Sequence, residues 1–443
     1  MKPPPDALWL LPLGGCGEIG INANLYGHDG RWLLVDCGIG FEDGGPRTRV
    51  IAPRLDAIAA RRDKLDGLLV THAHEDHVGS VAHHWPQLRC PVYCTPFTAA
   101  ILRGKLVDAG IVEEVPVHVV QPGDTTHHGP FSVRWMPITH STPESQSLLI
   151  QSPAGTVLHT GDWKLDAQPV VGPAHDERAL RALAQEPVLA LVGDSTNAPL
   201  PGRTPSEGAL HNPLLKAVES CKGRVVVGCF GSNLARLHTL LAVAAQTQRY
   251  PALMGRSLHR YTGAAREADL WNPATELVPP AHLGYLPRHE VMAIATGSQG
   301  ESYAALDRLS HQTHRDLDLE PGDAVIFSSR IIPGNETAVR ALQARLTALG
   351  VRVIEDEEDD TQPLHASGHP AQDDLRDMYD WVRPAIAIPV HGEDRHLKAH
   401  AALAKAVGVP SVLSPRNGDL VQLAPVPAVF RAKVPAGRID LER

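Results

Sequence analysis

Two patterns of apolar and polar residues take turns along most of the chain. Short runs at residues 8–13, 188–192 and 291–295 have the length and the Val, Ile and Leu content of buried strands. Between such runs lie stretches such as residues 234–241, where leucines recur at helical spacing. Strands that alternate with helices predict an α/β fold.

The first part of the chain has more specific patterns. Residues 22–26 and 31–35 flank a His28-Asp29-Gly30 turn, which predicts a pair of adjacent strands. The pattern at residues 50–64 is helical, so we expect a helix there.

The apolar run at residues 68–70 leads into a cluster of His72, His74, Asp76 and His77. In an extended segment residues two apart point the same way, so His72 and His74 can share one ion. If the chain then turns into a helix, Asp76 and His77 approach a second ion. Histidine and carboxylate suit zinc, and carboxylates also accept manganese. We therefore expect two Zn²⁺ ions, with Mn²⁺ as the alternative; the position at a strand-to-helix turn disfavours a merely polar loop.

Other strand-like runs also end in polar residues. His140, Asp162, Asp194 and His391 each follow or end such a run. Asp36 ends the run at 31–35 and is a candidate to orient a ligating histidine. His140 or Asp162 could be a surface residue when taken singly, but their order behind the cluster at 72–77 favours a shared site, as does the order of Asp36 before it.

Small hydroxyl- and glycine-rich loops follow three strand-like runs in the middle of the chain, beyond a Pro- and Gly-rich link at 199–206. They include Ser232 and Asn233, Ser298, and Ser328 and Ser329. Ser232 or Asn233 would cap a helix whose N-terminus attracts anions. One such loop is ordinary turn chemistry; three together indicate a surface that receives phosphates. The acidic run at 355–360 is expected to be a solvated loop.

The bulk composition describes an ordinary globular protein. The chain has 443 residues, 43% of them hydrophobic, enough for two or three domains. Its net charge of -9 argues against a general nucleic-acid coat protein but not against a nuclease with bound metals. Neither a signal peptide nor a membrane-spanning run is evident, so we expect a cytoplasmic protein without a membrane partner.

The ordered motifs resemble those of the β-CASP nucleases of the metallo-β-lactamase superfamily, and most closely the ribonuclease J family. The motifs that carry the resemblance lie at 71–79, 139–141, 160–164, 194–198, 296–301, 333–336, 367–369 and 389–393. The resemblance implies an α/β fold, a metallo-β-lactamase αββα sandwich with an inserted α/β β-CASP domain. The first part of the sandwich would span 1–198, the insert 199–362, the second part 363–430 and a C-terminal tail 431–443. The chain would be a short form that lacks the usual C-terminal domain.

The resemblance also implies roles for individual residues. His72, His74 and His140 would hold one metal, Asp76, His77 and His391 the other, and Asp162 would bridge both. Asp76, His369 and Asp194 would act in catalysis, His369 by protonating the leaving oxygen or clamping the phosphate, and Asp36 would orient a ligand. The residues that would contact phosphate or RNA are Ser232, Asn233, Ser298, Ser328, Ser329, His365, Ser367 and Gly368. Arg330 stands where the family pattern leads us to expect proline.

The function implied is that of a metal-dependent ribonuclease. It would hydrolyse RNA phosphodiesters from the 5′ end, internally or both, through a hydroxide activated by two metals. RNA with a 5′-monophosphate would be the preferred substrate, and a homodimer is a further expectation. The alternatives are a nuclease of the same fold that acts mainly on DNA, including single-stranded DNA, and a non-catalytic partner subunit. A partner subunit would be expected to have lost metal ligands, and none is lost here.

Overall fold

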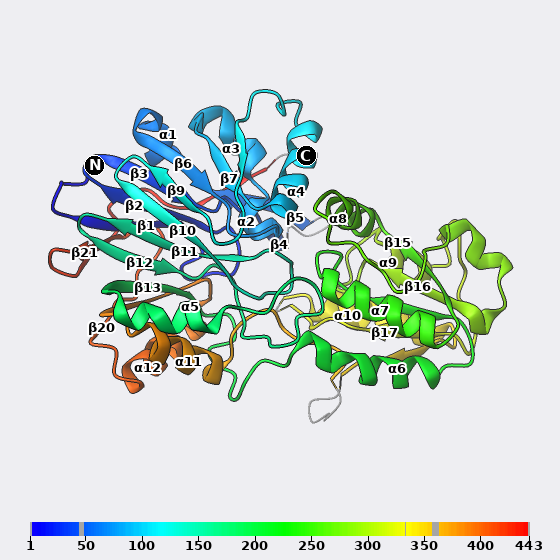
Figure 1. The fold of residues 1–443 in the computed structure, drawn as a ribbon. Coiled ribbons are helices and arrows are strands. Elements are labelled where there is room, and N and C mark those ends of the chain that lie inside the picture. Colours follow the sequence, from blue (N-terminus) through cyan, green and yellow to red (C-terminus); the bar gives the residue numbers. More distant parts are fainter. Residues whose placement is uncertain (1, 44–47, 333, 357–362, 442–443) are drawn as a thin grey trace. The chain divides into compact units, whose positions relative to one another are not determined.

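A computed structural model describes residues 2–43, 48–332, 334–356 and 363–441 (Figure 1). The chain divides into two compact units. The sandwich unit contains Met1–Leu165, Ala174–Thr204 and Gly368–Arg443, and the inserted unit contains Asp166–Pro173 and Pro205–Ser367. Each unit is described separately below.

Two mixed sheets face each other in the sandwich unit. The first has the order β22 (Ala428–Phe430), β21 (Leu420–Ala424), β1 (Leu8–Gly14), β2 (Ala23–His28), β3 (Arg31–Val35), β6 (Leu65–Leu69), β7 (Val92–Cys94) and β8 (Val117–Val119). The second has the order β20 (Ser411–Val412), β19 (Ile386–Val390), β13 (Val188–Asp194), β12 (Gly155–His159), β11 (Gln146–Ser152), β10 (Phe131–Pro137) and β9 (Thr125–His128). The predicted pair of strands at residues 22–26 and 31–35 is confirmed as the antiparallel β2–β3 pair.

The core of this unit lies between the two sheets. Tyr26 and Leu33 of the first sheet pack in one cluster with Trp135, Ile150 and Ile388 of the second. Strands β13 and β19 pair in parallel and are buried along nearly their whole length. Their near-continuous apolar runs fit strands that are covered on both faces.

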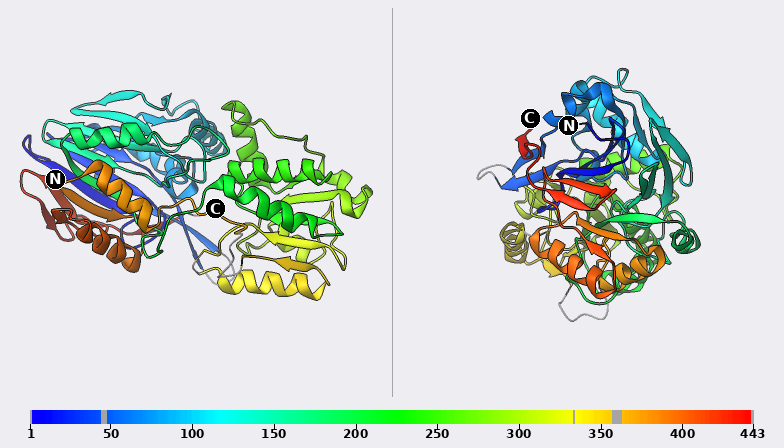
Figure 2. Two further views of the ribbon diagram at one scale, coloured as in Figure 1. Left: turned by 60° about the horizontal axis from the view of Figure 1, so that its bottom comes forward. Right: turned by 90° about the vertical axis from the view of Figure 1, so that its left-hand side faces the viewer.

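Helices cover the outer faces of both sheets, which gives the αββα arrangement (Figures 1 and 2). Helices α1 (Asp56–Ala59), α3 (Val81–Leu88) and α4 (Pro96–Asp108) lie on the first sheet. Helices α5 (Glu177–Ala182), α11 (Gln372–Val382) and α12 (Asp394–Ala406) lie on the second sheet, where Leu180, Leu375 and Leu403 join the same apolar cluster as Leu158 of β12.

The prediction of a helix at residues 50–64 is wrong for the first part of that range. Residues 50–53 belong to strand β5 (Thr48–Pro53), and only the short α1 and the 3-10 turn Arg62–Lys64 are helical. Strand β5 pairs on one side with β4 (Gly40–Asp43) and on the other with β23 (Arg438–Asp440). Pairing on both sides, with the neighbouring β4 and with β23 far along the sequence, overrides a weak local pattern.

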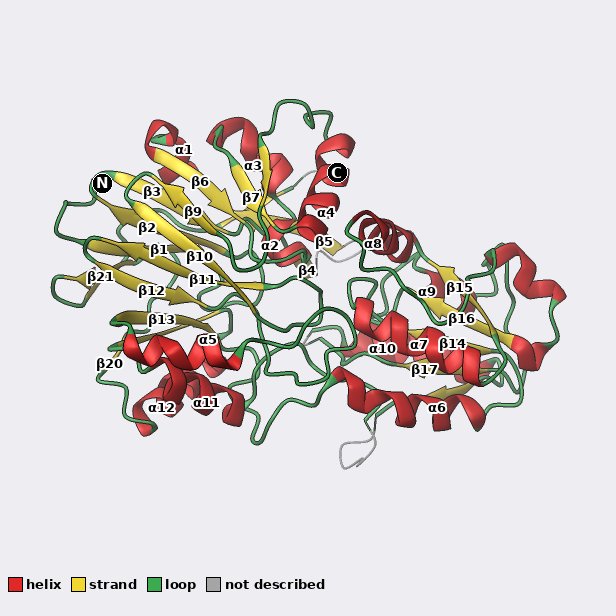
Figure 3. Cartoon of the chain, in the orientation of Figure 1, coloured by secondary structure: helices red, strands yellow, loops and turns green. Residues whose placement is uncertain are grey.

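The inserted unit is built on a five-stranded parallel sheet. Its order is β15 (Tyr250–Met254), β16 (Val291–Ala295), β14 (Val225–Gly228), β17 (Ala324–Phe327) and β18 (Arg352–Ile354). The helices of this unit are α6 (His211–Glu219), α7 (Leu234–Gln246), α8 (Arg256–Glu267), α9 (Ala305–Ser310) and α10 (Glu336–Ala348). Leu306 of α9 and Leu342 of α10 pack on Ala293 and Val325 of the sheet, while α6 and α7 cover the other face (Figure 3).

The two described residues of the acidic run at 355–360 lie in a loop, Glu355 half-buried and Asp356 exposed, and both accept hydrogen bonds. Glu355 accepts hydrogen bonds from Arg340, at 2.7 Å, and from the Gln343 amide, at 2.6 Å. Asp356 accepts the backbone N–H of Leu364. Residues 357–360 lie outside the described residues, as does Pro333 of the motif at 333–336.

Candidate metal centre

Loops and strand ends at one edge of the sandwich unit bring the candidate ligands together. In a mixed α/β sheet the carboxyl ends of parallel strands carry the residues that contact ligands. The residues that meet here follow β6, β10, β12 or β19, end β13, lie in the short helix α2 (Glu75–Val78) or precede α11. They are His72, His74, Asp76, His77, His140, Asp162, Asp194, His369 and His391.

One group of four donors consists of His72, His74, His140 and Asp162. The His74 Nδ1 atom lies 3.2 Å from His72 Nε2 and 3.0 Å from His140 Nε2. The Asp162 Oδ2 atom lies 3.8 Å and 4.0 Å from those two Nε2 atoms. Four donors held about 2.1 Å from one ion in a tetrahedron would be about 3.4 Å apart. The group therefore has the dimensions of a single metal site.

A second group consists of Asp76, His77, Asp162 and His391. His77 Nε2 lies 3.1 Å from Asp162 Oδ2 and 3.5 Å from Asp76 Oδ2. His391 Nε2 lies 3.1 Å from Asp76 Oδ2, and its Nδ1 lies 3.0 Å from Asp162 Oδ1. Asp162 thus presents one carboxylate oxygen to both groups.

A third group adds His369 and Asp194 to Asp162 and His391. His369 Nδ1 donates to Asp194 Oδ2 at 2.8 Å and lies 3.8 Å from Asp162 Oδ2. Asp194 is fully buried, and its other oxygen accepts from the backbone N–H and the hydroxyl of Thr196. The group places a carboxylate-bound histidine directly beside the second donor group.

The outward ring nitrogens fix how three of the histidines face the centre. His77 Nδ1 donates to Asp36 at 2.8 Å, and His140 Nδ1 donates to the carbonyl of Gly368 at 2.6 Å. The hydroxyl of Thr71 donates to Asp36 and so accepts from His72 Nδ1, at 3.0 Å. With the proton on Nδ1, Nε2 of the neutral His72 and His140 rings turns a lone pair toward the centre, and Nε2 of His77 does so once that ring gives up its second proton.

Burial and charge divide the histidines into two kinds. Burial lowers the pKa of His72 and His140 well below its usual value and lowers that of His74 to about 4, so these rings are neutral. Although burial opposes charge on His77 and His391, the nearby Asp162 carboxylate raises the pKa of both rings well above its usual value.

These residues fit a divalent metal. Three ring nitrogens of neutral histidines, Nε2 of His72 and His140 and Nδ1 of His74, converge at about 3 Å, an arrangement that a cation stabilises. Carboxylates adjoin them in both groups. Imidazole and carboxylate together are the ligands that Zn²⁺ accepts, and Mn²⁺ accepts the same oxygens.

Close backbone approaches hold two of the site's loops. A Cβ atom on Gly38 would lie 1.7 Å from the Asp76 carbonyl oxygen, and one on Gly368 would lie 2.6 Å from His140 Cε1. Asp36 and His391 both adopt positive φ angles, 63° and 51°, which are strained for residues with side chains.

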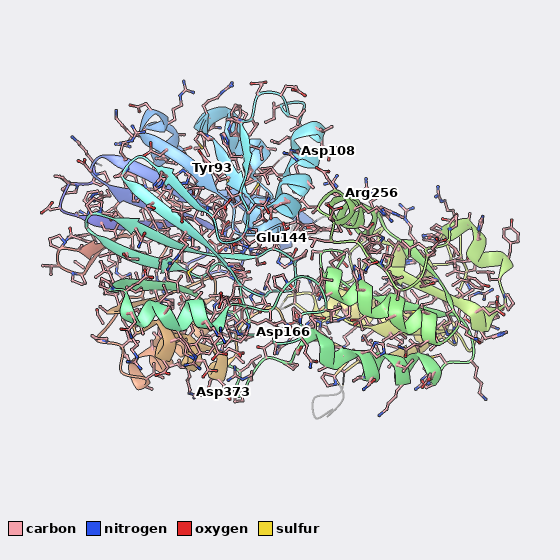
Figure 4. The ribbon with its side chains drawn as sticks, in the orientation of Figure 1. Tyr93, Asp108, Glu144, Asp166, Arg256 and Asp373 are labelled. Carbon is pink, nitrogen blue, oxygen red and sulfur yellow. The ribbon has the colours of Figure 1, made fainter. Side chains whose placement is uncertain are left out.

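The loop that carries His140 is attached to helix α4 through Glu144, which is labelled in Figure 4. The Glu144 carboxylate accepts the backbone N–H of Phe97 at 2.7 Å, in the first turn of α4. An acidic group at a helix N-terminus is favourable. This contact therefore helps to fix the position of His140.

The sequence did not identify three polar residues around the donors. The Asn22 amide contacts His77 Nε2 at 3.1 Å and donates to the Asp76 carbonyl. Thr71 contacts Asp36 and His72, and Thr196 lies 3.3 Å from His391 Nδ1. The sequence signal near Asn22 is the glycine-rich stretch 14–20, which indicates a close backbone approach without indicating its partner.

The residues predicted to contact phosphate are spread over both units. Asn233 caps α7, as predicted, by accepting the backbone N–H of Arg236 at 2.9 Å. Asn233 and Ser328 are buried, and both contact Arg236, which forms a buried ion pair with Glu207. Ser298 is buried as well, and Ser232, Ser329, His365 and Ser367 are half-buried. Gly368 is the one member of this set that belongs to the sandwich unit. Contact of these eight residues with phosphate stays a prediction.

Family models match three stretches of the chain. The model of the metallo-beta-lactamase superfamily matches residues 16–222. The ribonuclease J beta-CASP domain matches residues 222–346, and the Zn-dependent metallo-hydrolase RNA specificity domain matches residues 361–415.

Proteins named Ribonuclease J are similar over almost the whole chain. The one from Sinorhizobium meliloti is 42% identical over 98% of this chain and 77% of that protein. Those from Synechocystis sp. and Mycolicibacterium smegmatis are 36% and 37% identical, over 98% and 99% of this chain and 68% and 78% of those proteins.

Among solved structures, a protein of unknown function from Enterococcus faecalis has the same fold. Its TM-score is 0.63 at 14% identity, and the match covers 94% of this chain and all of that one. In the described part of the chain, every helix is too short or too polar to span a membrane.

Proposed function

Because the chain belongs to the ribonuclease J family and is a metal-dependent ribonuclease that acts on RNA, we propose which residues form its metal centre and how they act. One ion would be held by His72, His74 and His140 and a second by Asp76, His77 and His391, with Asp162 bound to both. The support for this assignment is that the two groups of converging donors share the Asp162 carboxylate.

The chemistry of the donors favours two Zn²⁺ ions, with Mn²⁺ as the alternative. When bound, two divalent ions make a water acidic enough to attack phosphorus near neutral pH and offset charge on the phosphoryl oxygens. Asp36 would keep His77 in the tautomer that presents Nε2 to the centre, and Gly368 would do the same for His140.

His369 would act on the leaving group. Its Nδ1–H is bound by Asp194, so Nε2 is the ring atom that would give a proton to the leaving oxygen or hold the scissile phosphate. Asp194 fixes the orientation of that ring and is itself fixed by Thr196. The contact between the buried Asp194 carboxylate and the half-buried His369 ring supports this division of roles.

The proposal includes a preference for RNA with a 5′-monophosphate. Hydroxyl-rich loops at the carboxyl ends of β14, β16 and β17 support it, because such strand ends receive phosphates in parallel sheets. Action in the cytoplasm, expected from the sequence, stays part of the proposal.

The test is a degradation time course with purified protein supplied with Zn²⁺ or Mn²⁺, together with measurement of bound metal. The substrates are 5′-monophosphorylated RNA, its 5′-triphosphorylated form and DNA of the same sequence. We expect preferential loss of monophosphorylated RNA. The His77→Ala variant should lose activity and bound metal, whereas His83→Ala, which changes an exposed histidine of α3, should retain both. Full metal content and activity in His77→Ala would overturn the ligand assignment.

A further inference from the structure

Two tyrosines in the inserted unit expose most of their side chains, and they lie at opposite ends of strand β16. Tyr303, 80% exposed, lies in the loop that follows β16. Tyr285, 88% exposed, ends the 3-10 segment Pro280–Tyr285 that precedes β16. Ligands of parallel α/β sheets bind at the carboxyl ends of the strands, so only Tyr303 lies on the ligand-binding edge.

The order of the strands marks the same edge. Strand β14 is central and first in sequence; the chain then adds β15 and β16 on one side and β17 and β18 on the other. The loops after β14, β16 and β17 therefore surround the point where the winding changes direction, which is where open α/β sheets bind their ligands.

The backbone of Tyr303 is held on both sides while its ring stays exposed. The Tyr303 N–H donates to Asp307 Oδ2 at 2.9 Å, and its carbonyl accepts from Arg308 Nε at 3.0 Å. Its φ angle of 66° is strained for a residue with a side chain, and such strain persists only where the surroundings impose it. A ring presented by a fixed backbone loses little freedom when it binds a ligand.

Gln299 joins this loop to the loop after β17. The Gln299 Nε2 donates to the carbonyl of Arg330 at 2.9 Å, and its Oε1 accepts the N–H of Ile332 at 2.8 Å. The Gln299 N–H in turn donates to Glu301 Oε2 at 2.9 Å. Arg330 is exposed, so the joined loops carry an exposed ring and an exposed cation.

We propose that Tyr303 is an RNA contact, whose ring stacks on a nucleobase of single-stranded RNA while Arg330 attracts a phosphate of the same strand. Rings that stack on bases, combined with cations along the backbone, are how proteins bind single strands without reading sequence. The inference rests on the proposed function only in taking RNA as the ligand; it requires no particular set of metal ligands.

The test is equilibrium binding of a single-stranded RNA oligonucleotide with phosphorothioate linkages, which resist cleavage, followed by fluorescence anisotropy with the intact metal-loaded protein. Tyr303→Ala should raise Kd by about 5-fold or more, the lower end of base-stacking losses, and Tyr303→Phe should bind like the parent. Tyr285→Ala is the matched control and should leave Kd unchanged. Far-UV circular dichroism of each variant monitors folding.

The salt dependence separates the two roles. Arg330→Gln should reduce the slope of log Kd against log salt by about 0.7, the value for one phosphate of a single strand. Tyr303→Ala should leave that slope unchanged, because stacking releases no counterion. Parental Kd in a folded Tyr303→Ala variant, or equal losses in Tyr303→Ala and Tyr303→Phe, would overturn the proposal.

The same variants distinguish this inference from the metal-centre proposal. Loss of binding in Tyr303→Ala with full metal content supports the RNA contact, even if His77→Ala turns out to keep its metal. Conversely, a metal-free, inactive His77→Ala variant alongside parental binding by Tyr303→Ala would support the metal centre and reject the RNA contact.

Discussion

At the scale of single residues, the candidate metal centre depends on side chains that hydrogen-bond to the donor histidines and orient them. Asp36 is fully buried, and its carboxylate accepts from His77 Nδ1 and from both the N–H and the hydroxyl of Thr71. It therefore fixes the orientation of His77 and, through Thr71, of His72.

We predict that Asp36→Asn weakens metal binding and lowers kcat, each by about 10- to 100-fold, the usual effect of removing such a partner. Metal affinity would be measured by competition with a chromogenic chelator, and kcat with RNA. Asp66→Asn, which alters a carboxylate paired with Arg31 instead, is the control and should keep parental values. If Asp36→Asn binds metal with parental affinity, the charge of the Asp36 carboxylate has no role in metal binding.

A second prediction concerns Gly368. Its Cβ-less backbone allows His140 to approach, and a methyl group there would lie 2.6 Å from His140 Cε1. We expect Gly368→Ala to displace His140 and lower bound metal and activity by on the order of 10-fold. Gly263→Ala in helix α8, where nothing lies within 4 Å, should keep both. Normal metal content in Gly368→Ala would mean that the loop can move aside without loss.

At the scale of elements, a buried chain of hydrogen bonds joins helices α11 and α12 to the end of β13. Tyr379 of α11 contacts His400 Nε2 at 2.8 Å, and His400 Nδ1 contacts the Ser195 hydroxyl at 2.9 Å. Ser195 follows Asp194, so these helices support the strand end that carries the partner of His369.

We predict that Tyr379→Phe lowers the free energy of unfolding by about 1–3 kcal/mol, because His400 Nε2 loses its partner in the interior. Urea unfolding of the variant and the parent measures this. Tyr285→Phe removes the same hydroxyl from an exposed ring and should change nothing. Equal stability of parent and Tyr379→Phe would contradict a structural role for this chain of bonds.

The helices and strands also show how much of the structure can be predicted from the sequence. The spacing of His72, His74, Asp76 and His77 is local, so it predicted converging donors, and strand ends identified His140 and Asp162. The family and the fold class are confirmed. The error at β5 and the omission of Glu144 have a common cause: each depends on contacts between segments far apart in the sequence, which no local pattern reports.

At the scale of the whole molecule, buried histidines that are not among the candidate metal donors limit stability in acid. Burial lowers the pKa of His84, His128, His159 and His400 to about 4. In the unfolded chain these rings take up protons below about pH 6.5. The contribution of these four rings to stability should therefore be level above about pH 6.5, fall as the pH drops toward 4, and level off below that as the folded rings titrate.

The expected loss is on the order of 1–3 kcal/mol for each ring over that range. Urea unfolding between pH 7.5 and 4, with a chelator present throughout so that metal release does not contribute, measures it. His400→Gln should show a shallower decline than the parent. If stability stayed constant from pH 7.5 to 4.5, these rings would become charged in the folded protein without any loss of stability, which would contradict the prediction.

The order of the strands has a consequence for synthesis on the ribosome. Strand β1 pairs with β21, Leu8 opposite Ala424, and β13 pairs with β19, Asp194 opposite Val390. The sheet of the inserted unit, by contrast, uses only strands from β14 to β18, which emerge together. A nascent chain can thus complete the inserted sheet while both sheets of the sandwich still wait for late strands. Early ribosome release would leave β13 with an open edge and without His391, so such fragments should be targets for chaperones and proteases.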